Sequence, residues 1–295
     1  MLAVLTSKPA AMPELPEVEI TRRGIEPHVS GQRIGEVVTR HLGLRYPFPP
    51  QLRECLIGQR VTAVRRRAKY ILLDAGDYVL LLHLGMSGSL RIFPRDTPAG
   101  KHDHFDLVLG EKVLRLRDPR RFGAVLLLEP PAELHALLAT LGCEPLADDF
   151  DGEVLYAMSR GRRTPIKPFI MDAHRIVGVG NIYASESLFR ARIHPATPAG
   201  QLNRKHCRVL ADAIKQTLQD ALAAGGSSLK DFVHSDGASG YFQQQYAVYG
   251  RDNQPCRVCG ATVERHVMAQ RATFCCPVCQ KTANTRGISR AKSGT

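Results

Sequence analysis

The chain has 295 residues, of which 44% are hydrophobic and 23% are charged, a composition that fits a folded protein with two or three compact units. Its formal net charge of +12 at pH 7 indicates a polyanionic partner, although a basic enzyme of another kind would show the same balance. No apolar run approaches the roughly 20 residues of a membrane span. Residues 1–11 are too weakly apolar for a secretory signal, so we expect a soluble, cytoplasmic protein.

The first half of the sequence predicts one helix followed by many short strands. The helix is expected over residues 16–28, with Pro16 in its first turn and Gly31 beyond its close. Apolar runs separated by Gly, Pro and Asp predict strands over residues 60–64, 70–73, 78–84, 89–93, 105–109, 113–116 and 124–128. Many short strands at this spacing favour an antiparallel sandwich or barrel over a doubly wound sheet.

The middle of the chain changes to helical spacing. Helices are expected over residues 131–141, 152–159, 181–191 and 204–224. The last of these carries a continuous apolar stripe and ends at a Gly-Gly pair. Together with the strands before them, these helices predict an α+β fold.

Basic residues gather in several separate places along the chain. They form clusters at residues 65–69, 117–121, 160–167 and 251–292. A surface that follows a phosphate backbone needs such distributed charge, so nucleic acid is the expected partner.

Four cysteines near the end of the chain predict a zinc site. Two Cys-x-x-Cys pairs are separated by sixteen residues, and their members are Cys256, Cys259, Cys276 and Cys279. Four thiolates close a tetrahedron around Zn²⁺ and leave no open position, so the metal is expected to be structural. Reduced free thiols are the alternative. Cys275 is a spare thiol that could compete with Cys276, although the spacing to Cys279 favours Cys276.

Six motifs, in this order along the chain, resemble those of the bacterial formamidopyrimidine-DNA glycosylases, enzymes that excise oxidised purines. They lie at residues 13–19, 66–70, 83–88, 118–123, 177–186 and 266–279. The resemblance covers nearly everything from Met12 to Lys281. It implies an N-terminal helix with an antiparallel β-sandwich at 13–142, a helix-two-turn-helix domain at 143–240 and a zinc-finger β-hairpin at 241–282. A disordered basic tail is expected at 283–295.

The resemblance also implies a bifunctional glycosylase and lyase. Pro13 would be the nucleophile, since an N-terminal secondary amine with a reference pKa of about 7.7–8.0 is partly unprotonated near neutral pH. Glu14 would protonate the sugar, with Glu17 supporting the site. Lys69 would assist base release and β-elimination, and Arg271 would clamp a phosphate and promote δ-elimination. From the residues alone, these would be a turn proline, helix-terminal glutamates and generic phosphate contacts.

Three further residues match those that fill the gap left by a flipped nucleotide. By the resemblance, Met86 and Phe122 replace the lost stacking, and Arg120 pairs with the orphaned cytosine. Without the resemblance, Met86 and Phe122 would more often be core residues.

Four other residues are expected at the DNA backbone, namely His102, Arg162, Lys167 and Asn181. Asn181 follows two glycines and opens a helix, where exposed N–H groups suit a phosphate; a simple N-cap is the alternative. Arg162 departs from the lysine common at its position, which preserves charge but not contact geometry. Residues 235–242 resemble the loop that covers the extruded base.

The position of Pro13 raises a difficulty, because residues 1–11 and Met12 precede it. An internal proline nitrogen is an amide without a proton and cannot form an iminium. Either translation begins at Met12, which is then removed, or the extension is genuine and blocks the chemistry. We expect the first, with residues 1–12 absent from the mature protein.

The expected protein is therefore a monomer that acts on double-stranded DNA containing oxidised bases, in the bacterial cytoplasm at the nucleoid, with one structural Zn²⁺. Two alternatives remain. An endonuclease VIII-like enzyme for oxidised pyrimidines usually carries glycine where Leu15 stands and lacks the Met/Arg/Phe arrangement. A catalytically silent, zinc-stabilised DNA-damage binder would result if the extension were retained.

Overall fold

The structure is a computed structural model that describes residues 13–226 and 242–281. The expected extension at 1–12, most of the 235–242 loop and the 283–295 tail lie outside the described residues.

The first part of the chain forms two four-stranded antiparallel sheets. One has the order β1-β6-β7-β5 and consists of Glu36–Thr39, Asp103–Leu109, Lys112–Arg117 and Ser89–Pro94. The other has the order β2-β3-β4-β8 and consists of Val61–Arg67, Tyr70–Ala75, Tyr78–His83 and Ala124–Leu128. Side chains from both sheets share one apolar core, so the sandwich is confirmed over the barrel.

The second sheet is apolar on both faces, which explains its continuous apolar runs. In β3, Ile71 and Leu73 face the sandwich core, whereas Leu72 packs in a separate cluster on the opposite face. Ala132 and Leu138 cover that opposite face. They belong to a 3-10 turn, η1 (Ala132–Leu134), and a one-turn helix, α3 (Ala136–Ala139).

The prediction of one continuous helix over residues 131–141 is therefore wrong. His135 is extended between η1 and α3, and its Nδ1 accepts a hydrogen bond from the Leu137 main-chain nitrogen, which starts a new turn. Among the strands and α-helices, three short elements were not expected at all, namely β1, α2 (Leu52–Leu56) and α5 (Ile166–Met171). Each is too short to show a period in the sequence.

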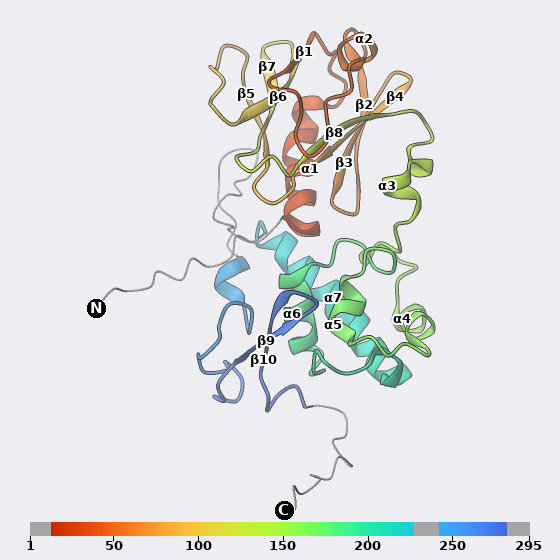
Figure 1. Cartoon of the computed structure of the whole chain (residues 1–295), viewed down its shortest axis with the longest axis vertical. Coiled ribbons are helices and arrows are strands. Elements are labelled where there is room, and N and C mark those ends of the chain that lie inside the picture. The colour runs from red at the N-terminus through yellow and green to blue at the C-terminus, as the bar shows by residue number, and fades with distance from the viewer. Residues whose placement is uncertain (1–12, 227–241, 282–295) are drawn as a thin grey trace, which may run out of the picture.

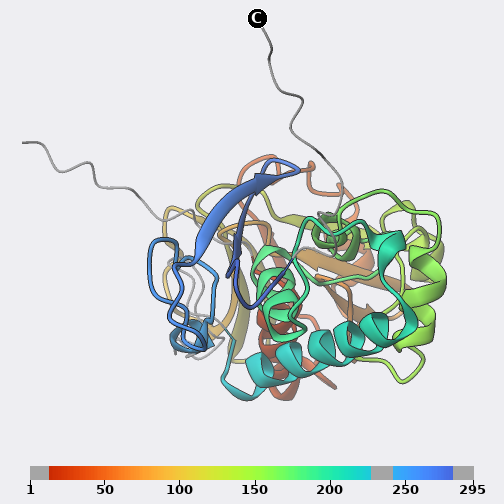
Figure 2. The same cartoon turned by 90° about the horizontal axis from the view of Figure 1, so that it is seen from below.

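Helices α4 (Gly152–Ser159), α5, α6 (Asn181–Arg190) and α7 (Arg204–Ala223) build the second half with the short turn η2 (Ala199–Gln201). The apolar stripe of α7 packs into this half's own core, through residues such as Leu210, Ile214 and Leu218. Figure 1 shows the sandwich above and these helices below, and Figure 2 shows α7 crossing the base of the molecule.

The expected first helix is α1 (Leu15–Val29), and it connects the two halves. Leu15 lies in the helical core and Val18 in the sandwich core. Near its start, the Leu15 main-chain nitrogen donates to Gly178 O at 3.2 Å. The residues just before α1 therefore lie at the junction of the halves.

The chain ends in a hairpin of β9 (Glu264–Met268) and β10 (Arg271–Cys275), which follows the turn η3 (Phe242–Gln245). Ala269 and Gln270 form its two-residue turn with positive φ values of 46° and 59°. None of the helices within 13–226 and 242–281 is long and apolar enough to cross a membrane.

Candidate active site and zinc site

Glu14 is buried against the N-terminus of α6, with 3% of its surface exposed. Its Oε1 accepts a hydrogen bond from the Ile182 main-chain nitrogen at 3.1 Å, and its Oε2 lies 3.4 Å from the Tyr183 nitrogen. Burial, with a further contribution from the nearby Glu17 charge, raises the pKa of Glu14 to about 7, against the opposing effect of Lys69. The carboxyl group can therefore both donate and accept a proton near neutral pH.

Glu17 holds the start of α1 in place. Its Oε2 accepts from the Glu14 main-chain nitrogen at 2.9 Å, which completes a capping box. Its Oε1 accepts from the Tyr183 hydroxyl at 2.5 Å. Pro13, the expected nucleophile, is also buried and directly precedes this capped end.

Lys69 lies at the tip of the β2–β3 hairpin, after Ala68, whose φ of 53° is left-handed. The Ala68 main-chain nitrogen donates to Glu144 Oε1 at 2.7 Å, and Arg67 donates to the same oxygen at 3.0 Å. Burial lowers the pKa of Lys69, and the charge of Arg271 acts in the same direction, while Glu14 opposes both. The hairpin thus brings a lysine of reduced basicity to the carboxyl group.

Lys167 joins the helical half to the terminal hairpin. Its Nζ donates to Asn181 Oδ1 at 2.6 Å, Thr273 Oγ1 at 2.8 Å and Ala272 O at 2.9 Å, and the residue is 1% exposed. Burial lowers the pKa of Lys167 to about 8. All three ammonium hydrogens are used, so a DNA contact, which stays a prediction, would require one to change partner.

Arg271 is exposed at the start of β10, and Asn181 is the first residue of α6. The N-cap of α6 is Gly180, so the simple N-cap interpretation of Asn181 is wrong. His102 is partly exposed and Arg162 is exposed. Their expected contacts with DNA stay predictions.

Met86, Arg120 and Phe122 come together on two loops that are joined by a buried aspartate. Asp118 Oδ1 accepts from Ser87 Oγ at 2.7 Å and from the Arg120 main-chain nitrogen at 3.2 Å. Phe122 is 45% exposed, and the Arg120 guanidinium lies 5.0 Å from its ring centre. Met86 is partly buried. The exposure of Phe122 excludes a core role for this residue, and the expected insertion of these side chains into a duplex stays a prediction.

The close approach of these loops depends on glycine. Gly85 has φ +64°, and a Cβ there would lie 2.5 Å from the Phe122 main chain. The Gly85 nitrogen donates to His83 Nδ1 at 3.1 Å, and burial lowers the pKa of His83 to about 4, so that this ring nitrogen stays an acceptor. On the other loop, the Gly123 nitrogen donates to Asp118 Oδ2 at 2.7 Å.

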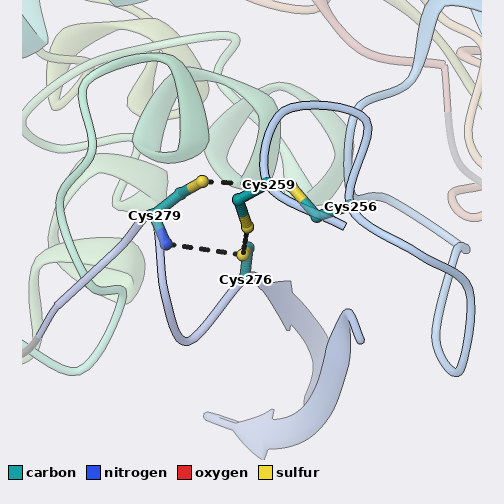
Figure 3. Close-up of side chains that lie close together, drawn as sticks. All are labelled: Cys256, Cys259, Cys276 and Cys279. Carbon is teal, nitrogen blue, oxygen red and sulfur yellow. Dashed lines mark hydrogen bonds between the residues drawn. The ribbon is translucent and has the colours of Figure 1, made fainter. Parts of the chain in front are cut away.

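The sulfur atoms of Cys256, Cys259, Cys276 and Cys279 converge, all within 4.8 Å of one another, as Figure 3 shows. The sulfur–sulfur separation is 3.9 Å between Cys256 and Cys279 and 3.4 Å between Cys259 and Cys276. Zn–S bonds of about 2.3 Å in a tetrahedron give edges of about 3.8 Å, so the four thiols fit one structural Zn²⁺. Cys275 is buried outside this group, which confirms Cys276 as the ligand.

Asp118, Ser87, Tyr183 and Glu144 support the site, although the sequence did not assign them these roles. The first three lie inside motifs singled out above, so position within a motif was the available signal. Glu144 had no such signal.

Comparison with known proteins identifies the family. The sequence matches the family models described as Formamidopyrimidine-DNA glycosylase N-terminal domain over residues 12–125 and Formamidopyrimidine-DNA glycosylase H2TH domain over residues 141–233. A third, described as Zinc finger found in FPG and IleRS, matches residues 253–282. The chain belongs to the formamidopyrimidine-DNA glycosylase family. The expected resemblance, α+β fold and zinc finger are thereby confirmed.

Two proteins named Formamidopyrimidine-DNA glycosylase are similar to this chain over most of its length. The protein of Aromatoleum aromaticum is 56% identical over 270 residues, which cover 92% of this chain and 100% of the relative. One from Stenotrophomonas maltophilia is 53% identical over 271 residues, with the same coverage.

Solved structures of the family agree with the fold. The Lactococcus lactis Fpg in complex with abasic-site DNA has a TM-score of 0.84 and 34% identity, covering 91% of this chain and 100% of that one. MutM (Fpg) of Thermus thermophilus has a TM-score of 0.82 and 38% identity, covering 92% and 100%. A MutM complex with carbocyclic 8-oxo-G DNA has a TM-score of 0.84, 34% identity and coverage of 92% and 100%.

Proposed function

We propose that this chain excises oxidised purines, 8-oxoguanine and formamidopyrimidines, from duplex DNA and then cleaves the abasic strand. The observation that carries this is the Pro13–Glu14 pair, in which a buried carboxyl group of pKa about 7 directly follows the proposed nucleophile. The names of the similar proteins and the damaged DNA in the solved complexes support the substrate class.

In the proposed reaction, the Pro13 amine attacks C1′ of the flipped nucleotide. The bond from C1′ to the base breaks, and the base leaves with a proton. Glu14 donates a proton to the ring oxygen as the sugar opens, which leaves an iminium between Pro13 and C1′. The iminium acidifies the neighbouring C–H, and loss of that proton expels the 3′ phosphate by β-elimination.

The basic groups around this centre have separate proposed roles. Lys69, with its lowered pKa, assists base release and takes part in proton removal during β-elimination. Arg271 holds a phosphate beside the centre and promotes δ-elimination, which expels the second phosphate. The exposed Arg120 and Phe122, with Met86, fill the duplex opposite the flipped nucleotide, where Arg120 pairs with cytosine.

The proposal requires a free Pro13 amine, and therefore a mature chain that begins at Pro13. The match to the N-terminal family model begins at residue 12, which supports a start at Met12; the removal of Met12 is part of the proposal. His102, Arg162, Lys167 and Asn181 are proposed to act at the DNA backbone. The protein is proposed to work as a monomer at the bacterial nucleoid.

Borohydride trapping tests the nucleophile. A chain produced from Met12, with Met12 removal verified by mass, should form a covalent product with duplex DNA containing 8-oxoguanine opposite cytosine. The same chain carrying residues 1–12 should form none, because its Pro13 nitrogen is an amide. Equal trapping by both chains would reject Pro13 as the nucleophile.

Substrate choice is tested on the same Pro13-started chain. Release of an oxidised pyrimidine without release of 8-oxoguanine would support the endonuclease VIII-like alternative. Tight binding to both lesions without any trapped product would support a silent damage binder.

A further inference from the structure

Three potential metal ligands outside the four-cysteine zinc site lie together on one face of the terminal hairpin. They are a carboxylate oxygen of Glu264, a ring nitrogen of His266 and the sulfur of Cys275, all within 4.8 Å of one another. Cys275 is fully buried, whereas the side chains of His266 and Glu264 are 42% and 48% exposed. A cation could therefore reach the buried sulfur from the solvent side.

The strand register explains why these side chains meet. Cys275 of β10 is paired directly with Glu264 of β9, and Thr273 is paired with His266. Residues two apart on a strand share a face, so Cys275 lies opposite Glu264 and diagonal to His266. The arrangement follows from paired main chains rather than from flexible side chains alone.

A fourth group supports the sulfur from the loop after α6. His194 Nε2 lies 4.0 Å from Cys275 Sγ. His194 Nδ1 accepts a hydrogen bond from the Ala196 main-chain nitrogen at 3.2 Å, so the neutral ring carries its proton on Nε2 and directs it at the sulfur. His194 is thus a polar neighbour of the buried sulfur and not a further ligand.

The loop that carries His194 is tied to the zinc site. Gln280 Nε2 donates to Ile193 O at 3.0 Å, and Gln280 Oε1 accepts from the Cys276 main-chain nitrogen at 2.9 Å. His194 is thus held in a fixed position relative to β10.

We infer that Glu264, His266 and Cys275 form a second, exchangeable site for a borderline or soft divalent cation such as Zn²⁺. One sulfur, one imidazole nitrogen and one carboxylate oxygen are ligands that Zn²⁺ accepts, and water would complete the tetrahedron. On binding, the Cys275 thiol proton passes to solvent and the sulfur bonds the metal. The Glu264–His266 contact, now 3.0 Å, is replaced by bonds to the cation.

Such a site would stiffen the hairpin that presents Arg271. The same face of β10 carries Thr273, which accepts from Lys167. A cation bridging β9 and β10 beside this contact would hold both strands against the helical half. It should therefore raise the melting temperature roughly with the logarithm of free zinc above the dissociation constant, through binding to the folded state.

Zinc titration of the holoenzyme, with the metal of the four-cysteine site retained, tests the inference. The wild type should bind a second equivalent that a chelator of micromolar affinity removes. His266→Ala should weaken that equivalent by about tenfold or more, since loss even of an outer-shell partner costs about this much. Arg265→Ala is the matched control, because Arg265 lies between the two ligands on the other face of β9 and should leave the second equivalent unchanged.

Cobalt identifies the sulfur ligand. With the first site filled by zinc, added Co²⁺ should give a thiolate charge-transfer band in the wild type that is lost in Cys275→Ser. Retention of the first zinc and of borohydride trapping verifies that the variant is folded. A stoichiometry that stays at one zinc in excess metal would overturn the inference, as would a second equivalent unaffected in both His266→Ala and Cys275→Ser.

Discussion

The carboxylate of Glu14 occupies the N-terminus of α6, with Oε1 3.1 Å from the Ile182 main-chain nitrogen. A helix N-terminus attracts negative charge, and here the protein's own carboxyl group takes that position. The contact fixes the direction of the carboxyl group in the residue that follows Pro13.

Gly180 makes this contact possible. A Cβ at residue 180 would lie 2.1 Å from Glu14 Cδ, so Gly180→Ala must displace the carboxyl group. We expect a loss of single-turnover base excision of about 10²-fold, the scale of a catalytic group displaced by about 1 Å. Gly35→Ala is the control, since a Cβ there meets nothing closer than 3.8 Å and should leave the rate unchanged.

Glu14→Gln should change the pH dependence of stability. The folded protein holds the Glu14 proton to about pH 7, whereas the unfolded chain loses it near 4.5. The contribution of the Glu14 carboxyl group to the free energy of unfolding is therefore fully present below pH 4.5 and is lost as the pH rises through about 7. Relative to the wild type, the variant should gain up to about 3 kcal/mol between pH 5 and 8. Denaturant unfolding of both proteins at each pH measures this, and parallel curves would contradict it.

Lys167→Met should destabilise the protein rather than only weaken DNA binding. The change leaves three acceptors without their donor, and a loss of about 3 kcal/mol in unfolding free energy is expected. Arg162→Ala is the contrasting variant, since Arg162 is exposed. Its free energy of unfolding should stay within about 0.5 kcal/mol of the wild type. The slope of log binding constant against log salt concentration should fall by about one. The reverse pattern would show that Lys167 serves DNA directly.

Glu144→Ala should move Lys69. Loss of the carboxylate leaves the Ala68 main-chain nitrogen without its acceptor and removes partners of Arg66 and Arg67. Borohydride trapping on 8-oxoguanine DNA should slow by about tenfold or more, as for a misplaced catalytic group. Glu144→Gln should recover part of the rate by restoring an acceptor. Glu133→Ala, which removes an exposed partner of Arg65, should have no effect.

Removal of zinc should unfold the terminal hairpin and weaken DNA binding without removing any metal-centred chemistry. Chelation verified by metal analysis, followed by binding measurements, checks this expectation. Full binding by zinc-free protein would contradict it.

The sequence predicted the longer helices and strands because each spans enough residues to show a hydrophobic pattern. Strands β2 to β8 and helices α4, α6 and α7 were expected within a few residues. The helix expected over residues 131–141 was too long, because His135 separates η1 from α3 and starts the new turn with a local hydrogen bond. The helix α5 was missed for its length alone.

The sequence predicted which residues form the site, but not the contacts that hold them in place. Motifs placed Glu14, Lys69 and the zinc cysteines, whereas Glu144 is distant in sequence from the hairpin it supports. Lys167 shows the limit most clearly. It was expected at the DNA backbone, and only the fold shows that its ammonium group is enclosed by three acceptors.

Helix α1 contributes Leu15 to one core and Val18 to the other. Neither core can open without disturbing the same helix, so the sandwich and the helical half should lose their structure in one cooperative transition. A change that disturbs the packing of either half would then also displace the first residues of α1. A destabilising change in either half should therefore lower the activity and the fraction of folded protein together.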